Sequence, residues 1–392
     1  MNVQSVAGAN ALPRFASIAE LIEKLRPVKP TFALQPAKFR EAAKRFLEGF
    51  PGTTMYAVKA NPAGYVLDQI WAAGVRHFDT ASLGEIELVR ARYPEAHCHF
   101  MHPVRAPGSA AAAYHQYGLK DFVVDCDEEF AKLMAETGGA NDLRVFVRLA
   151  TPLGGALLEL SSKFGTNPDE AARLLKRVRD TGVTPALTFH VGSQCLSAFS
   201  YAQAIEIARR ACQKSGIDVT VLDIGGGFPA PYATTELPPY GWYFDTITEA
   251  LQTIPNHETL HVMCEPGRAL AAEGVSLVAQ VFLRKGDKLY INDGIYGSFD
   301  ELTLPGFDED YPVSALRVGP SGRAGEPGGA MRPYRVYGPT CDTLDVLPRP
   351  AMLPDSLTAG DFLVFDCIGA YSVAARSSFN GFFPDDWAMV GS

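Results

Sequence analysis

The sequence is poor in the features that mark disulfide-bonded, zinc-stabilised or membrane-spanning proteins. Its seven cysteines are scattered singly and form no CxxC pair, which argues against a disulfide framework or a structural zinc site. No uncharged run reaches the ~18 residues that a membrane-spanning helix needs. Residues 1–15 lack a basic stretch followed by an apolar segment, so they do not resemble a secretory leader. We expect a cytoplasmic protein that binds no metal.

Basic charge is also scarce. The chain carries 35 Lys and Arg against 44 Asp and Glu, a net charge of −9. Sequence-independent binding to nucleic acids or anionic membranes needs a concentrated basic surface, so we expect neither as a partner. A composition of 47% hydrophobic and 20% charged residues excludes wholesale disorder, and 392 residues are enough for two domains.

Short β-rich runs alternate with amphipathic helical runs over residues 30–270. This alternation predicts βα units and a parallel sheet covered by helices, and about eight repeats favour a (β/α)8 barrel over an open sheet. The expected strands are 31–34, 55–58, 77–79, 98–101, 121–125, 144–149, 186–190, 220–224 and 261–264. The expected helices include 37–48, 83–92, 128–137, 169–181 and 201–215.

The pattern changes after Gly267. Short alternating runs separated by Gly and Pro turns, with few helical periods, predict a C-terminal β domain over residues 271–392. We expect residues 1–29 to form an N-terminal segment that packs with this domain. The predicted fold is therefore an α/β barrel followed by a β domain.

Polar residues that end the apolar runs are the first candidates for chemistry, because reactive groups lie at the carboxyl ends of barrel strands. Lys59 follows such a run and is flanked by Val58 and Ala60. Desolvation there would favour the neutral amine that Schiff-base chemistry needs, although a lysine that merely extends from a strand end into solvent is the commoner explanation. His190 ends another run, where a lone histidine is more often a hydrogen-bonded structural residue.

A glycine turn at 225–227 follows the run 220–224. Its backbone N–H groups could surround a phosphate, although a tight turn alone would also explain it. Glu265 and Arg268 end the next run; a glutamate can hold a proton on a heteroaromatic nitrogen, and an arginine binds phosphate through several N–H groups. Together with Lys59, these features suggest a phosphorylated cofactor that forms a Schiff base.

A set of motifs in this chain resembles, in the same order, those of the fold type III pyridoxal-phosphate decarboxylases. The resemblance is to their ornithine/lysine branch, which forms diamines. The motifs are 56–61 (YAVKAN), 78–82 (FDTAS), 162–165 (SKFG), 189–193 (FHVGS), 225–229 (GGGFP), 265–268 (EPGR), 338–342 (GPTCD), 369–371 (GAY) and 379–382 (FNGF). They cover nearly the whole chain.

The resemblance implies a role for each matched residue. Lys59 would form the Schiff base with pyridoxal 5'-phosphate and His190 would stack on the pyridine ring. Glu265 would keep the ring nitrogen protonated, so that the ring accepts the electron pair left by loss of carbon dioxide. Other positions implied around the cofactor are Asp79, Arg148, Ser193, Gly225, Gly226, Gly227, Gly267, Arg268 and Tyr371, and Glu85 and Lys163 match further positions around the cofactor and a dimer contact.

The resemblance also implies the substrate class and the assembly. Cys341 would reach the active site of the neighbouring subunit of a homodimer and give a proton to the α-carbon. Asp342 would bind the distal amine of the substrate, and Tyr296 and Phe379 would lie at the substrate. Because the diaminopimelate branch usually carries glutamate after this cysteine, Asp342 favours L-ornithine, which gives putrescine, or L-lysine, which gives cadaverine.

One position departs from the pattern. The ornithine enzymes usually supply a second substrate-facing acid at a place that here falls near Leu304 and Pro305. The acids nearby, none of them in register, are Asp300, Glu301, Asp308 and Asp310. Arg105 stands where related enzymes often carry a lysine and receives no role.

Three other functions stay open. The enzyme could decarboxylate a larger amino acid such as diaminopimelate or carboxynorspermidine. It could be a racemase of the same barrel, although racemases protonate with a tyrosine and Cys341 argues against that. It could be a binding protein that resembles the antizyme inhibitors and has lost the cofactor, but Lys59, Glu265 and Arg268 are intact.

Overall fold

The computed structural model describes residues 12–151, 155–158 and 162–391. These residues form two compact units. The first unit contains the described residues of Met1–Phe39, Pro231–Thr235 and Ala271–Ser392, and the second contains those of Arg40–Ala230 and Glu236–Leu270. In these described ranges, no helix is long and apolar enough to cross a membrane.

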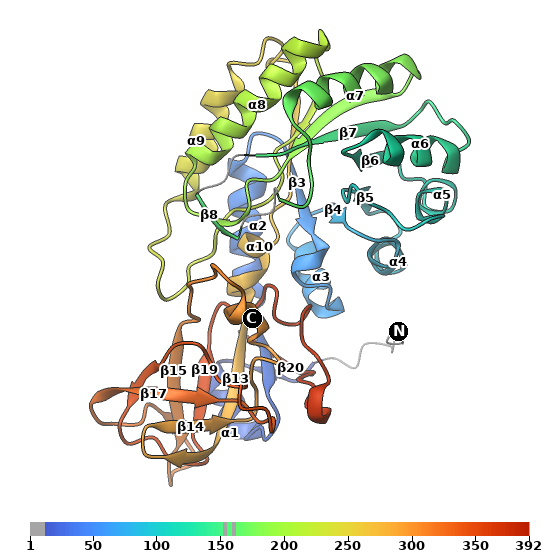
Figure 1. The fold of residues 1–392 in the computed structure, drawn as a ribbon. Coiled ribbons are helices and arrows are strands. Elements are labelled where there is room, and N and C mark those ends of the chain that lie inside the picture. The colour runs from blue at the N-terminus through green and yellow to red at the C-terminus, as the bar shows by residue number, and fades with distance from the viewer. Residues whose placement is uncertain (1–11, 152–154, 159–161, 392) are drawn as a thin grey trace. The chain divides into compact units, whose positions relative to one another are not determined.

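The second unit contains a closed barrel of eight parallel strands in the order β11-β12-β3-β4-β5-β6-β7-β9. Strands β3 to β7 of this barrel are labelled in Figure 1. The strands are β3 (Thr53–Ala57), β4 (His77–Thr80), β5 (His97–Phe100), β6 (Asp121–Val124), β7 (Arg144–Leu149), β9 (Thr184–Phe189), β11 (Val221–Asp223) and β12 (His261–Cys264). The helices are α2 (Pro36–Gly49), α3 (Gly64–Ala72), α4 (Leu83–Arg92), α5 (Ser109–His115), α6 (Asp127–Glu136), α7 (Pro168–Asp180), α8 (Phe199–Ser215), α9 (Tyr240–Leu251) and α10 (Arg268–Ala271), with the 3-10 turn η1 (Val58–Ala60). Strands β8 (Ala156–Leu158) and β10 (Ser193–Cys195) pair separately. The predicted (β/α)8 barrel is confirmed.

Local sequence explains where the barrel helices begin. Helix α4 starts after Ser82, whose hydroxyl accepts the Glu85 N–H, while the Glu85 carboxylate accepts the Ala81 N–H. This reciprocal arrangement satisfies two of the N–H groups that a helix start leaves without partners. Helix α7 starts after Asn167, whose side chain accepts N–H groups of the first turn.

Apolar side chains fill the interior of the barrel. They come from successive strands and are almost completely buried: Met55, Met101, Val123, Phe146, Ala186, Val221 and Met263. The interior is therefore a packed core rather than a pore, and polar chemistry is confined to the strand ends.

The first unit is built on a ten-stranded sheet in the order β1-β20-β2-β13-β14-β17-β18, with β15, β16 and β19 off this path. Its strands are β1 (Arg14–Phe15), β2 (Thr31–Leu34), β13 (Val275–Lys285), β14 (Lys288–Ile291), β15 (Val313–Val318), β16 (Ala324–Gly325), β17 (Met331–Tyr337), β18 (Ala351–Pro354), β19 (Phe362–Phe365) and β20 (Asp386–Val390). It also contains α1 (Ile18–Leu25) and the 3-10 turns η2 (Ala272–Gly274), η3 (Asp300–Thr303) and η4 (Phe379–Gly381).

Strand β2 differs from the expectation from sequence. We expected residues 31–34 in the barrel, but β2 pairs with β13 and β20 in the sheet of the first unit. All four of its residues are buried, and a short buried strand carries no signal that distinguishes one sheet from another. The predicted barrel range of 30–270 therefore begins with a strand and a helix start that belong to the other unit.

Candidate active site

Lys59 and Asp79 lie together at the carboxyl end of the barrel. Lys59 lies on η1, directly after β3, and Asp79 lies on the neighbouring strand β4. The Lys59 Nζ atom is 2.6 Å from the Asp79 Oδ2 atom, and the side chains of the two residues are 39% and 1% exposed. A reactive amine is thus held by a buried carboxylate while its own side chain stays accessible.

The residues that the resemblance implies for phosphate binding lie near three other strand ends. The Arg268 Nη2 atom donates to the Ser193 hydroxyl at 3.1 Å. The glycine turn at 225–227 adopts φ angles of 67° at Gly225 and 102° at Gly227, and a Cβ atom at Gly225 would lie 2.2 Å from the carbonyl oxygen of Phe189. Only glycine fits this turn, because it lacks a Cβ atom and tolerates positive φ.

Gly267 packs the Arg268 loop against the turn that carries Lys59. A Cβ atom at Gly267 would lie 2.8 Å from the Cβ atom of Ala60. Glycine therefore lets the end of β12 approach η1 closely, which brings the arginine and lysine motifs to one end of the barrel.

His190 follows β9 and is held by backbone hydrogen bonds. Its Nδ1 atom accepts the Gly192 N–H at 3.0 Å, and its carbonyl oxygen accepts the Thr151 hydroxyl at 3.0 Å. Burial lowers the pKa of His190 well below its ordinary value, and the positive charges of Lys59 and Arg148 lower it further. A neutral imidazole with its proton on Nε2 follows, because Nδ1 already acts as an acceptor.

Glu265 follows β12 and forms a buried pair with Asp223 of β11. The two residues are 7% and 0% exposed, and their carboxyl groups lie close enough to influence each other's pKa. Burial raises the pKa of Asp223 to about 6 and the pKa of Glu265 well above its ordinary value, and the neighbouring Asp79 carboxylate raises both further. Sequence reasoning missed Asp223. The signal was an acidic residue at the end of an otherwise apolar strand, just before the glycine turn.

Arg148 and Lys163 both lie close to one aromatic ring, that of Phe164. The guanidinium carbon of Arg148 is 5.5 Å from the centroid of the Phe164 ring, and the Lys163 Nζ atom is 4.9 Å from it.

Glu85 and Arg105 have structural contacts within the barrel unit. The Glu85 carboxylate caps the start of helix α4, as described above, and burial raises its pKa. Arg105 is 3% exposed and lies 3.3 Å from the Glu129 carboxylate, so it stabilises the barrel wall.

A second cluster of predicted site residues lies in the first unit. The Tyr296 hydroxyl donates to the Asp342 carboxylate, and the Tyr296 and Phe379 ring centroids are 4.6 Å apart. The exposed Cys341 donates its backbone N–H to the Asn380 side chain at 3.1 Å. The Leu344 N–H and the Tyr296 hydroxyl lower the pKa of Asp342, so this partly exposed group stays ionised.

Asp345 organises this second cluster and was missed from sequence. Its side chain accepts the backbone N–H of Ile295 at 3.0 Å and also bonds to Thr340. Cβ atoms at Gly294 and Gly338 would lie 2.0 and 2.1 Å from its Oδ1 atom. The two glycines therefore let two loops close around one carboxylate.

Tyr371, the remaining cofactor residue implied by the resemblance, also lies in the first unit. Its φ angle of 56° is unusual for a residue with a side chain. It follows Gly369, where a Cβ atom would lie 1.9 Å from the carbonyl oxygen of Ala271. The close approach of Gly369 to the backbone fixes the start of this turn.

Acidic residues near Leu304 and Pro305 form contacts within the first unit. Asp310 pairs with Arg349 at 2.7 Å, and the neighbouring Glu309 accepts the hydroxyl groups of Thr234 and Thr235. Asp300 begins η3, and burial raises its pKa. The Asp310 and Glu309 carboxylates thus do not replace the substrate-facing acid that the sequence lacks near Leu304 and Pro305.

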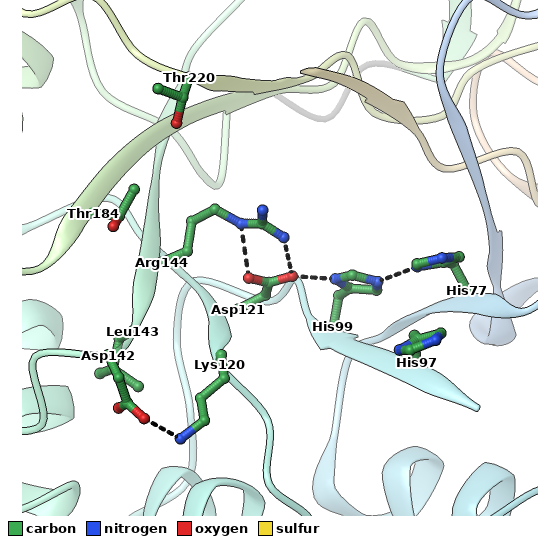
Figure 2. A pocket seen from close by; sticks show the side chains of 10 residues that line it. All are labelled: His77, His97, His99, Lys120, Asp121, Asp142, Leu143, Arg144, Thr184 and Thr220. Atoms are coloured by element: carbon green, nitrogen blue, oxygen red, sulfur yellow. Dashed lines mark hydrogen bonds and ion pairs between the residues drawn. The ribbon is translucent and has the colours of Figure 1, made fainter. Parts of the chain in front are cut away.

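A separate polar cavity of about 420 Å³ lies at the amino end of the barrel, opposite the Lys59 end (Figure 2). The His99 ring is hydrogen-bonded to His77 at 3.0 Å and to Asp121 at 2.5 Å, and the Arg144 guanidinium donates two hydrogen bonds to the same Asp121 carboxylate. The polar groups of these residues are hydrogen-bonded to one another. Groups at this end of a barrel serve stability rather than catalysis.

The donor set at the Lys59 end fits pyridoxal phosphate. It offers an amine, a neutral and partly buried imidazole, a buried carboxyl group, and an arginine next to a hydroxyl group and a glycine turn. A (β/α)8 barrel with these groups at the carboxyl ends of its strands defines a class of enzymes that use this cofactor.

Comparison with known proteins gives the family. Residues 36–272 match the family model described as pyridoxal-dependent decarboxylase, pyridoxal binding domain, and the chain belongs to that family. It is 33% identical over 338 residues to the lysine/ornithine decarboxylase of Selenomonas ruminantium, covering 84% of this chain and 81% of the relative.

Two solved structures agree. The lysine/ornithine decarboxylase of Vibrio vulnificus, in complex with cadaverine, has a TM-score of 0.80 at 31% identity over 96% of this chain and 99% of its own. The arginine decarboxylase of Paramecium bursaria Chlorella virus, bound to agmatine, has a TM-score of 0.82 at 26% identity over 94% and 98%. The protein is a pyridoxal-phosphate-dependent decarboxylase of basic amino acids.

Proposed function

We propose that the substrate is L-ornithine or L-lysine and that the product is putrescine or cadaverine. The observation that carries this proposal is the ionised, partly exposed Asp342 carboxylate, which accepts the Tyr296 hydroxyl and lies next to Cys341 in the chain. A carboxylate at this place attracts the distal ammonium group of a basic amino acid. The similarity to a lysine/ornithine decarboxylase supports the same choice.

The barrel residues would hold the cofactor. Pyridoxal phosphate, when bound, supplies an aldehyde for covalent attachment and a ring that accepts electrons. Lys59 provides the amine for attachment, and Asp79 orients it. Arg268, Ser193 and the glycine turn at 225–227 bind the phosphate group.

Two further barrel residues would act on the ring, and one residue of the first unit on the substrate. The neutral His190 ring would pack against the cofactor ring, and Glu265 would hold the proton of the ring nitrogen. Cys341 would donate the proton that replaces the lost carboxyl group on the α-carbon, because Cys341 is exposed and a thiol is a better proton donor than a hydroxyl group.

A product screen tests the substrate. Purified protein with pyridoxal phosphate would be offered ornithine, lysine, arginine, diaminopimelate and carboxynorspermidine, and the amines would be identified by mass spectrometry. We expect putrescine or cadaverine to form fastest. In Asp342→Asn the KM for that substrate should rise about tenfold or more, because a charge-assisted hydrogen bond is lost. Faster turnover of diaminopimelate or carboxynorspermidine would overturn the proposal.

We also propose a homodimer in which Cys341 of one subunit completes the site of the other. Lys59→Ala and Cys341→Ala should each be strongly impaired in amine formation. Mixing the two proteins should then restore up to about a quarter of the amine-forming activity. About half of the dimers are mixed, and each of these has one intact site of two. No recovery after demonstrated subunit exchange would contradict the shared site.

A further inference from the structure

Asn380 connects the loop of the proposed proton donor to a third segment of the first unit. It lies in the 3-10 turn η4, directly after Phe379, and its side-chain oxygen accepts the Cys341 N–H at 3.1 Å. The function proposed above gives Asn380 no part. Cys341 is exposed, so close packing does not fix its backbone, and hydrogen bonds from the surrounding segments have to do so.

Two successive backbone N–H groups of this loop are held by side chains from different places in the chain. The Thr340 N–H donates to the Asp345 carboxylate at 3.0 Å, and the Cys341 N–H donates to Asn380 at 3.1 Å. Each bond fixes the plane of one peptide group, and the two planes meet at Thr340. The peptide group between Thr340 and Cys341 determines where the Cys341 side chain starts, so Asn380 limits the directions in which the thiol can point.

Asn380 is itself fixed by its backbone conformation and by its neighbours. Its φ and ψ angles are 53° and 15°, a left-handed conformation that asparagine tolerates better than most residues with a side chain. The Ser377 N–H and hydroxyl both donate to the Tyr296 carbonyl at 2.9 Å, and the Phe379 and Tyr296 ring centroids are 4.6 Å apart. The segment that carries Asn380 is therefore anchored to the Tyr296 loop, and the acceptor for the Cys341 N–H is held in place.

We propose that Asn380 is a positioning residue that aims the Cys341 thiol at the α-carbon of the substrate. In the step that it serves, the Cys341 S–H bond breaks and a C–H bond forms at the α-carbon, which leaves a thiolate that recovers its proton from water. When the thiol is aimed less well, more protons are added at the C4′ carbon of the cofactor instead, and water then releases an aldehyde and pyridoxamine phosphate. This inference rests on the role proposed for Cys341.

Two variants of Asn380 separate the acceptor from the turn. Glycine adopts a positive φ angle without strain but has no side-chain oxygen, so Asn380→Gly keeps the turn and loses the bond to the Cys341 N–H. Asn380→Asp keeps an oxygen acceptor on a side chain of nearly the same shape, and aspartate also tolerates this conformation. Because the acceptor is what positions Cys341, the aspartate variant should resemble the unmodified protein and the glycine variant should not.

The first measurement is made on the cofactor-free protein. Hydrogen exchange at the Cys341 N–H, followed by mass spectrometry of overlapping peptides, reports whether this group is hydrogen-bonded. Exchange should be about fivefold faster in Asn380→Gly, the factor expected for the loss of one ordinary hydrogen bond, and should not be faster in Asn380→Asp. Asn256→Gly is the matched control, because it removes a side-chain bond to the Val219 carbonyl in the other unit and should leave exchange at Cys341 unchanged.

The second measurement is the division of products in the protein with bound pyridoxal phosphate. The fraction of turnovers that end in pyridoxamine phosphate should rise severalfold in Asn380→Gly. It should stay at the level of the unmodified protein in Asn380→Asp and in Asn256→Gly. A defect in folding alone would reduce the amount of active protein and would leave the ratio of the two products unchanged.

The outcomes separate the role of Asn380 from that of Cys341. If Cys341→Ala diverts turnovers to pyridoxamine phosphate while Asn380→Gly changes neither the product ratio nor the exchange at Cys341, the role of Asn380 is wrong and that of Cys341 stands. Equal product ratios in Asn380→Asp and Asn380→Gly would also contradict the role, because the acceptor would then be irrelevant. If Cys341→Ala itself forms amine normally and no pyridoxamine phosphate, the role of Cys341 fails, and the positioning role fails with it.

Discussion

The buried carboxylate of Asp345 accepts both polar groups of Thr340, the backbone N–H at 3.0 Å and the hydroxyl at 2.7 Å. Thr340 immediately precedes Cys341, and the same carboxylate binds the Ile295 N–H next to Tyr296. One side chain thus fixes the two loops that carry the proposed proton donor and a residue of the proposed substrate site.

Asp345→Ala should therefore lower both stability and amine formation. It leaves backbone donors without partners, which we expect to lower the free energy of unfolding by about 2–3 kcal/mol. Thr340→Val removes only the hydroxyl bond and should cost about 1 kcal/mol. Urea unfolding and amine release would be measured on both proteins. Equal stability of Asp345→Ala and the unmodified protein would contradict the role.

Lys59 should be the residue that carries the cofactor covalently. Borohydride reduction followed by peptide mass spectrometry should find the cofactor on Lys59, and Lys59→Ala should leave at most non-covalent cofactor. Lys163→Ala is the matched control, because Lys163 lies beside Phe164 rather than beside Asp79, and it should still be labelled at Lys59. Fixation of cofactor to Lys59→Ala would show that another amine reacts.

Cys341 should decide where the proton goes after carbon dioxide is lost. Cys341→Ala should slow amine formation while carbon dioxide is still released, and part of the turnover should yield an aldehyde and pyridoxamine phosphate. Serine should behave like alanine, because a hydroxyl is a far weaker acid than a thiol.

Carbon dioxide, amine and pyridoxamine phosphate would be measured together on the Cys341 variants. Cys126→Ser, which changes a partly exposed cysteine of the barrel unit, controls for loss of a thiol. An unchanged amine yield in Cys341→Ala, without pyridoxamine phosphate, would assign the proton to another donor.

The histidines at the amino end of the barrel should make stability depend on pH. Burial, together with His99 and His97, lowers the pKa of His77 from 6.5 to about 4. Between pH 6.5 and about 4, His77 is therefore protonated in the unfolded chain but not in the folded protein. Stability is complete above 6.5 and falls as the pH drops toward about 4. After discounting for partial exposure, we expect His77 to account for about 1–2 kcal/mol of this fall.

His77→Gln should flatten that part of the stability profile. The measurement is the free energy of unfolding of the cofactor-free protein at several pH values across this window. His190, His102 and His261, whose pKa values are also lowered, act in both proteins, so the difference between the two profiles isolates His77. Parallel profiles would contradict the prediction.

The sequence alone determined the barrel and most of the cofactor groups. Alternating β and α runs predict the fold because hydrophobic periodicity records which face of each element is buried. Lys59, Glu265 and Arg268 could be found because parallel strands all end at one edge, so residues that stop apolar runs must lie close together.

Only the tertiary structure decided which sheet contains β2 and which acids lie close to each other. A short buried strand fits many sheets, and its partners β13 and β20 lie more than 200 residues away in the chain. Asp223 and Asp345 looked like ordinary acids because their significance depends on what surrounds them. Burial and hydrogen bonding determine the protonation of Asp223, and hydrogen bonds from two loops determine the structural role of Asp345. Neither property can be inferred from the neighbouring residues in the sequence.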